Sequence, residues 1–120
     1  IEKYNNILAK QLLMDYLSGK NKKLDFVAEI DIVISSLTKL LEIAETSERH
    51  SLIGSALKRK ATICSKRADK IETLTKAAYH YYKAHERDTS NSMYSLVNWI
   101  YELYPIPAVM ITSLITFVFI

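Results

Sequence analysis

The sequence predicts an all-helical domain of five to six antiparallel helices, and composition and hydrophobic spacing are the observations behind it. Only two Gly and two Pro occur in 120 residues, far fewer than the turns of a β-sandwich or barrel require. Apolar residues make up 49% and recur at helical spacing, which is enough to bury one core. We expect a single helical domain over 1–120. Because the first residue is Ile1 rather than Met, we expect this domain to be a fragment of a longer protein.

Two helices are expected in the first half of the chain, over residues 2–18 and 23–45. Gly19 follows the first of these, and Gly readily adopts the left-handed conformation that ends many helices. The second carries apolar residues at positions i, i+3, i+4 and i+7 along its whole length. Its run Ile32-Val33-Ile34 would suit a strand, but it lies inside this periodic stretch, so we predict helix.

Two more helices are expected over about 48–65 and 67–86. Thr46 and Ser47 are favourable N-cap residues ahead of the first. Gly54 in its interior costs about 1 kcal/mol relative to Ala, which indicates a close approach by a neighbouring helix. The apolar faces of the two helices are expected to contain Leu52, Ile53, Ala56, Leu57, Ala61 and Cys64, and Ile71, Leu74, Ala77, Ala78, Tyr81, Tyr82 and His85.

The last part of the chain predicts a fifth helix at about 92–104, ended by Pro105-Ile106-Pro107, and then the apolar segment 105–120. We expect a final buried helix in this segment, with a strand as the alternative. Packing within the fold or against a second copy, giving a homo-oligomer through 105–120, is favoured. Membrane insertion is the alternative, although a spanning helix needs about 20 apolar residues.

The charge and residue inventory argues against several classes of function. A formal net charge of +3 is mild, so a nucleic-acid partner is not favoured. Two glycines cannot form a phosphate loop or a dinucleotide fingerprint, and no residues suggest catalysis, cofactor binding or metal binding. His50, His80 and His85 are expected to be partly exposed polar positions, and Glu42 and Glu45 to pair with Arg49. No signal peptide is evident and there is one cysteine, so we expect a cytoplasmic protein, with membrane association as the alternative.

A resemblance to a known family rests on two short patterns. Ala77, Tyr81 and Ala84 have the small–aromatic–small spacing found in the second helix of a tetratricopeptide (TPR) repeat. The stretch Leu52-Ile53-Gly54-x2-Leu57 is similar to the first helix of such a repeat. Residues 48–104 therefore resemble a degenerate, elongated TPR unit. The resemblance implies a right-handed helical array that binds a peptide or partner protein in a groove, acts as a scaffold and is not an enzyme.

Aromatic residues concentrated after residue 78 are the best lead to a binding surface. Tyr79 and Tyr82 are three positions apart while Tyr81 points to another face, so these rings cannot all enter one core. Tyr and Trp are enriched in protein-binding hot spots. The alternative is that they only pack between helices. The residues that we predict to contact a partner are Tyr79, Tyr82, Lys83, Asn98 and Trp99.

Overall fold

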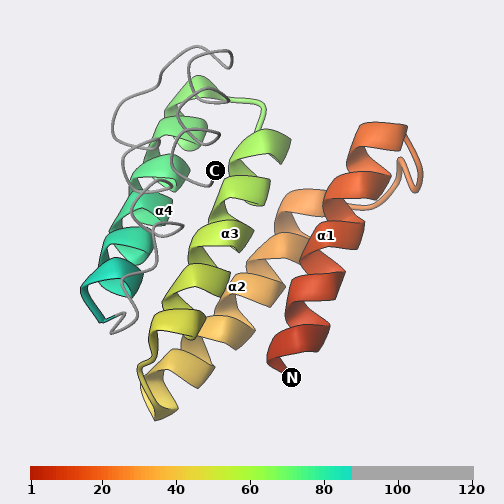
Figure 1. Ribbon diagram of the computed structural model, residues 1–120. Helices are drawn as coiled ribbons and strands as arrows, with labels where there is room; N and C mark the ends of the chain where they lie inside the picture. Colours follow the sequence, from red (N-terminus) through yellow and green to blue (C-terminus); the bar gives the residue numbers. More distant parts are fainter. Residues whose placement is uncertain (88–120) are drawn as a thin grey trace, which may run out of the picture.

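The structure, a computed structural model, describes residues 1–87, which form four α-helices (Figure 1). The helices are α1 (Glu2–Ser18), α2 (Phe26–Ile43), α3 (Ser47–Ile63) and α4 (Arg67–Arg87). Each runs antiparallel to the next, so α1 and α2 form one hairpin and α3 and α4 another. The helical prediction is confirmed for this part of the chain, including Ile32-Val33-Ile34 inside α2. The described residues hold four helices, as expected before residue 88, and the fifth and sixth helices expected at 92–104 and within 105–120 lie outside them.

Side-chain and backbone caps set the helix ends. Gly19 has φ 74° and ends α1, as predicted. The Asp25 carboxylate accepts the backbone N–H of Ala28 at 3.1 Å, so α2 begins at residue 26 rather than at 23. Extended backbone at Ala44 ends it. The Thr46 hydroxyl accepts the N–H of Arg49 at 3.1 Å and starts α3, as the cap prediction requires.

The core forms around α3, which packs against each of the other three helices. Two predicted members of the α4 inner face are wrong, because Ile71 is 55% and Tyr82 is 38% exposed. Both lie toward the solvent side of the helix, where neighbouring α3 does not reach. The buried apolar side chains that meet in the main cluster are Ala9, Leu12, Ile30, Val33, Leu37, Ile53, Ala56, Leu57, Ala77 and Tyr81.

Gly54 and Tyr81 explain how α3 and α4 approach so closely. A Cβ atom placed on Gly54 would lie 3.0–3.1 Å from carbons of the Tyr81 ring, closer than such atoms normally come. The Tyr81 hydroxyl lies 2.9 Å from the Ser55 hydroxyl, which holds the ring in place. Ala77 and Ala84 are fully buried one turn before and after the ring. The prediction that Gly54 marks a close helix contact is confirmed.

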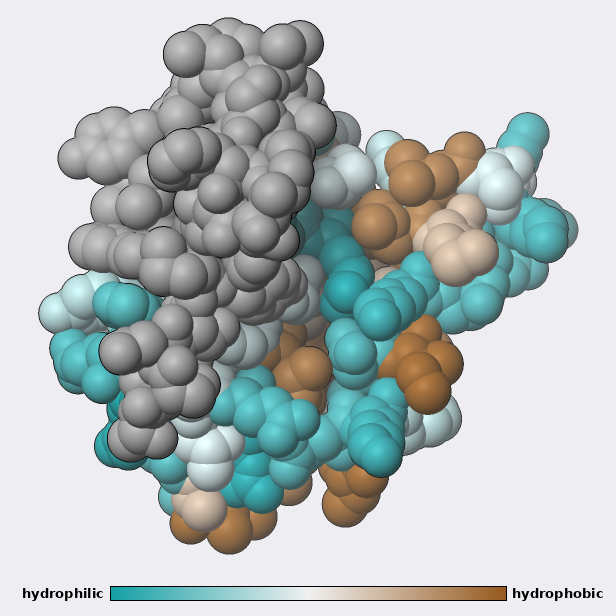
Figure 2. Space-filling model, in the orientation of Figure 1, coloured by the Kyte–Doolittle hydropathy of each residue, from teal (hydrophilic) through white to brown (hydrophobic). Residues whose placement is uncertain are grey.

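The first helix is apolar on two sides. Ala9 and Leu12 are buried against the other helices, whereas Tyr4, Ile7 and Met14 on the opposite side are more than 60% exposed. Figure 2 shows apolar side chains as separate patches on the side of the molecule where α1 lies. In the part of the chain that the structure describes, no helix combines the length and the hydropathy needed to span a bilayer.

Candidate functional site

A groove of about 620 Å³ runs between α2 and α4, with α3 along its floor. Helices two apart in the sequence form its walls, so its shape follows from the way the two hairpins pack. Apolar side chains of α3, including Ile53 and Leu57, line the floor, and polar groups line much of both walls. The lining residues are Val27, Asp31, Ile34, Ser35, Thr38, Ile53, Leu57, Lys60, Cys64, Asp69, Glu72, Thr73, Lys76 and His80.

The charged groups of the groove are mostly paired with one another. Lys60 Nζ lies 2.7 Å from an Asp31 oxygen and connects the floor to the α2 wall. Lys76 and Glu72 form an i,i+4 pair at 3.2 Å on the α4 wall. Asp69, on the first turn of α4, makes no ion pair with any residue among 1–87. A ligand in the groove would therefore meet, at that end, a carboxylate that no residue among 1–87 pairs.

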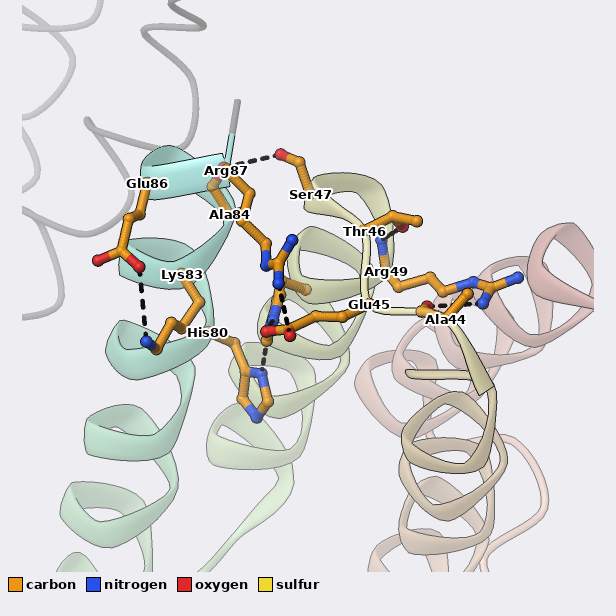
Figure 3. A network of polar contacts seen from close by, with 11 residues as sticks. Ala44, Glu45, Thr46, Ser47, Arg49, His80, Lys83, Ala84, Glu86 and Arg87 are labelled. Atoms are coloured by element: carbon orange, nitrogen blue, oxygen red, sulfur yellow. Dashed lines mark hydrogen bonds and ion pairs between the residues drawn. The ribbon is translucent and has the colours of Figure 1, made fainter. Parts of the chain in front are cut away.

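A chain of polar contacts reaches one wall of the groove from the end of the α3–α4 hairpin. Arg87 Nη2 donates to one Glu45 oxygen at 2.7 Å, and the other Glu45 oxygen lies 2.7 Å from His50 Nε2. His50 Nδ1 in turn lies 3.0 Å from His80 Nδ1. Figure 3 shows the His80 ring extending from α4 at the end of this chain. We call these four side chains the histidine chain.

Burial, neighbouring charge and hydrogen bonds shift the pKa values of His80 and Glu45. Burial, and then the charge of His50, lowers the pKa of His80 from 6.5 to about 4, so this ring is neutral at pH 7. Hydrogen bonds from His50 and then Arg87 hold the pKa of Glu45 below its ordinary value. Glu45 is therefore an ionised carboxylate, which can only accept hydrogen bonds.

The sequence did not predict this polar chain, and two of its expectations are wrong. His50 is 2% exposed instead of a partly exposed polar position. Arg49 pairs with Glu2 of α1 at 3.1 Å rather than with Glu42 or Glu45. Glu45 lies beyond the end of α2, where the chain turns and brings it to His50 and Arg87. Residues 45, 50, 80 and 87 come together only in the fold. Their spacing in the sequence follows no regular period, so it does not predict these contacts.

The predicted contact residues lie partly beside the groove. The Tyr79 ring meets the edge of the His80 ring with centroids 5.2 Å apart, and Lys83 Nζ lies 5.8 Å from the centre of the Tyr79 ring. Tyr79 is 55% exposed, so it forms an open rim next to the His80 wall. Tyr82 is one turn along α4, and its hydrogen bond to Glu86 raises the pKa of the phenol. Asn98 and Trp99 lie outside the described residues.

Metal-ligating side chains do not gather in groups of three or more anywhere within residues 1–87. Cys64 is buried, as its place on the inner face of α3 predicted. The Nδ1 atom of His85 is buried without a hydrogen-bond partner among the described residues. The groove offers a ligand both hydrogen-bonding groups and apolar contacts.

A comparison with protein families identifies the chain. The family model Tetratricopeptide Repeats-Sensor (TPR-S) matches residues 1–103, and the chain belongs to this family. The match confirms the resemblance seen at 48–104 and extends it to α1 and α2. None of the curated proteins and none of the solved structures compared with the chain matches it.

Proposed function

We propose that this chain is a protein-interaction module that binds an amphipathic helix of a partner protein in the groove between α2 and α4. Membership of a tetratricopeptide family supports a role in binding proteins. The observation that carries the proposal is the groove itself, which has two helical walls and an apolar floor. A groove of this kind suits a helix that presents apolar side chains at i, i+3 or i+4, and i+7.

The charged groups of the groove indicate which charged side chain the partner helix should carry. Lys60 and Lys76 are already paired with carboxylates, whereas Asp69 has no ion-pair partner among residues 1–87. A basic side chain of the partner helix next to Asp69 would complete the pairing. We therefore expect a helix with an apolar stripe and a Lys or Arg at the end that lies over the first turn of α4.

Tyr79 and Lys83 of α4 extend the binding surface beyond the groove. Tyr79 is exposed and lies against His80, and Lys83 lies over the Tyr79 ring, so both can contact a helix seated in the groove. An exposed aromatic ring beside a groove buries a large area at low entropic cost when a partner covers it. Tyr82, Asn98 and Trp99 stay predicted contacts. Tyr82 faces away from the groove wall, and Asn98 and Trp99 lie outside the described residues.

Selection from a phage-displayed library of helical peptides tests the proposal. Enriched peptides are synthesised and their Kd values for the full chain are measured by fluorescence anisotropy. Ser35→Phe places a ring in the groove, because Ser35 is an exposed lining residue of α2. This variant should weaken binding by at least about tenfold, which corresponds to about 1.4 kcal/mol.

The matched control is Thr75→Phe, which adds a ring at an exposed position of α4 that does not line the groove. It should leave the Kd unchanged. Equal affinity of both variants for the enriched peptides would place binding elsewhere on the chain and contradict the proposal. Failure to enrich any helical peptide would also contradict it.

A further inference from the structure

The contact between His50 and His80 limits how many protons the two rings can hold together. Their Nδ1 atoms lie 3.0 Å apart, and the ring centroids are 5.2 Å apart, so the rings meet edge to edge through these two atoms. One Nδ1 must carry a hydrogen and the other must be bare, because only then does one donate to the other. Two N–H groups that face each other at this distance would repel. The contact therefore excludes the state in which both Nδ1 atoms are protonated.

This limit holds for either charge state of His50. Its Nε2 lies 2.7 Å from Glu45, an ionised carboxylate, so Nε2 carries a hydrogen in both states. If His50 is neutral, its bare Nδ1 accepts from His80 Nδ1, whether His80 is neutral or charged. If His50 is charged, its Nδ1 donates to a bare Nδ1 of His80. The pair thus keeps its contact with no extra proton or with one, and loses it with two.

His80 is the ring that moves when the contact is lost. The His50 side chain is only 2% exposed and is bonded to Glu45, which Arg87 holds from the end of α4 (Figure 3). His80, in contrast, is only partly buried and lines the groove. A charged His80 can therefore reach water by turning into the groove, whereas His50 has no such path without the loss of its bond to Glu45.

From these contacts we infer that the two histidines form a pH-sensitive switch, which holds His80 against α3 until a second proton releases it into the groove and weakens the binding of a partner helix. This inference rests on the proposed function and concerns its regulation. A released His80 is a cation in the space that the apolar stripe of the partner would occupy. Covering a charge with apolar side chains costs free energy, so the released state binds the partner less well.

The surroundings of the pair set the pH at which the switch operates. Burial, and then the charge of His50, lowers the pKa of His80 to about 4, so the second proton is bound only in acid. Lys76 and Lys83 lie one turn before and after His80 on α4 and oppose the same charge. The other charged or titratable side chains around the pair and the groove are Glu45, Arg87, Tyr79, Asp31, Lys60, Asp69 and Glu72.

Nitrogen-15 NMR of the full chain tests the switch without a partner. A scalar coupling between two ring nitrogens is seen only when a hydrogen bond joins them, and the chemical shifts report which nitrogens are protonated. The coupling between His50 Nδ1 and His80 Nδ1 should be present at pH 7 and fall to about half near pH 4. No coupling at pH 7, or a coupling that persists when both rings are fully protonated, would overturn the inference.

Circular dichroism over the same pH range separates the switch from acid unfolding. The coupling should decrease at a pH where the helical signal is still that of the folded chain, because only one side chain has to move. If the coupling and the helical signal are lost together, release of His80 is not a step separate from unfolding, and the inference fails.

The pH dependence of peptide binding provides the second readout. The probes are groove-selected peptides without Asp, Glu or His, so that only the protein titrates. At pH 4 about half of the pairs should hold the second proton, which makes the Kd about twice its value at pH 7. His80→Gln should show a smaller ratio between the two Kd values. Asp31, Asp69 and Glu72 titrate in both proteins, so the difference between the ratios belongs to His80.

His85→Gln is the matched control, because it removes another imidazole from α4 that does not line the groove. It should keep the wild-type ratio of Kd values. Equal ratios for the wild type and His80→Gln would overturn the regulation of binding even if the coupling behaves as expected. If no peptide is enriched, the proposed function fails, whereas the NMR coupling decides separately whether the two histidines form the switch.

Discussion

The two hairpins of the described chain use their apolar residues differently. In the α3–α4 hairpin, Gly54 admits the Tyr81 ring, and polar contacts at one end join the helices to the turn before them. Figure 3 also shows the Ser47 hydroxyl bonded to the Ala84 carbonyl, at 2.7 Å, across this hairpin. In the α1–α2 hairpin, large apolar side chains such as Ile7 and Ile43 remain exposed. Truncation of a tyrosine should therefore cost more at the buried Gly54–Tyr81 contact than on the half-exposed side of α1.

Replacing a tyrosine in each hairpin gives the largest expected difference. Tyr81→Ala removes a side chain that is 1% exposed and should lower the free energy of unfolding by about 3–5 kcal/mol. Tyr16→Ala in α1 removes a ring that is 40% exposed and only meets the edge of Phe26, so it should cost about 1 kcal/mol. Urea unfolding followed by circular dichroism measures both. Equal losses would contradict the contrast between the hairpins.

The close contact at Gly54 predicts the next largest effect. Gly54→Ala raises helix propensity by about 1 kcal/mol, yet its new methyl group would press on a ring that Ser55 and the core hold in place. We expect a net loss of about 1–3 kcal/mol, as for an overpacked core. In a Tyr81→Leu background the same substitution should be neutral or stabilising, because the aromatic ring is gone. A stabilising effect in the wild-type background would mean that the ring can move.

The histidine chain predicts a pH dependence located in the second hairpin. The pKa of His80 is about 4 in the folded chain and 6.5 when unperturbed, so between these values the unfolded chain binds more protons. The contribution of His80 to stability should be constant above about pH 6.5 and fall as the pH drops toward 4. Protonation of Glu45, whose pKa is lowered in the fold, adds to the loss at the acidic end.

Thermal unfolding at a series of pH values measures this dependence. His80→Gln can still form a hydrogen bond with His50 Nδ1 but does not titrate, so its Tm should vary less between pH 6.5 and 4.5 than that of the wild type. His85→Gln is the matched control, because it removes another imidazole from α4 without changing the contact between His50 and His80. Identical slopes for wild type and His80→Gln would show that His80 does not control the acid response.

The outer side of α1 predicts the smallest effect. Ile7→Lys and Met14→Lys change side chains that are 64% and 61% exposed, so each should alter the free energy of unfolding by less than about 0.5 kcal/mol. Leu12→Ala on the buried side of the same helix should cost about 2–5 kcal/mol. The same unfolding experiment compares them. A large loss from either lysine variant would show that the outer side of α1 is covered in solution.

The helices and much of the core could be predicted from the order of the amino acids alone. Few Gly and Pro and a sustained period of three to four residues require helices, because apolar groups at that spacing share one face. Capping residues such as Gly19 and Thr46 set several helix ends, and they could be predicted because a cap acts within one helical turn. The spacing of Ala77, Tyr81 and Ala84 indicated the repeat family because small residues beside a ring are a requirement of close helix packing.

The groove and the histidine chain, in contrast, depend on how the helices pack against one another. The walls of the groove come from α2 and α4, and their distance depends on how the hairpins pack on α3. Glu45, His50, His80 and Arg87 lie in three different segments, so helical periodicity, which relates residues within a helix, cannot bring them together. The burial of His50 likewise depends on its neighbours in space. Its hydrogen bonds to Glu45 and His80 offset the cost of removing a polar ring from water.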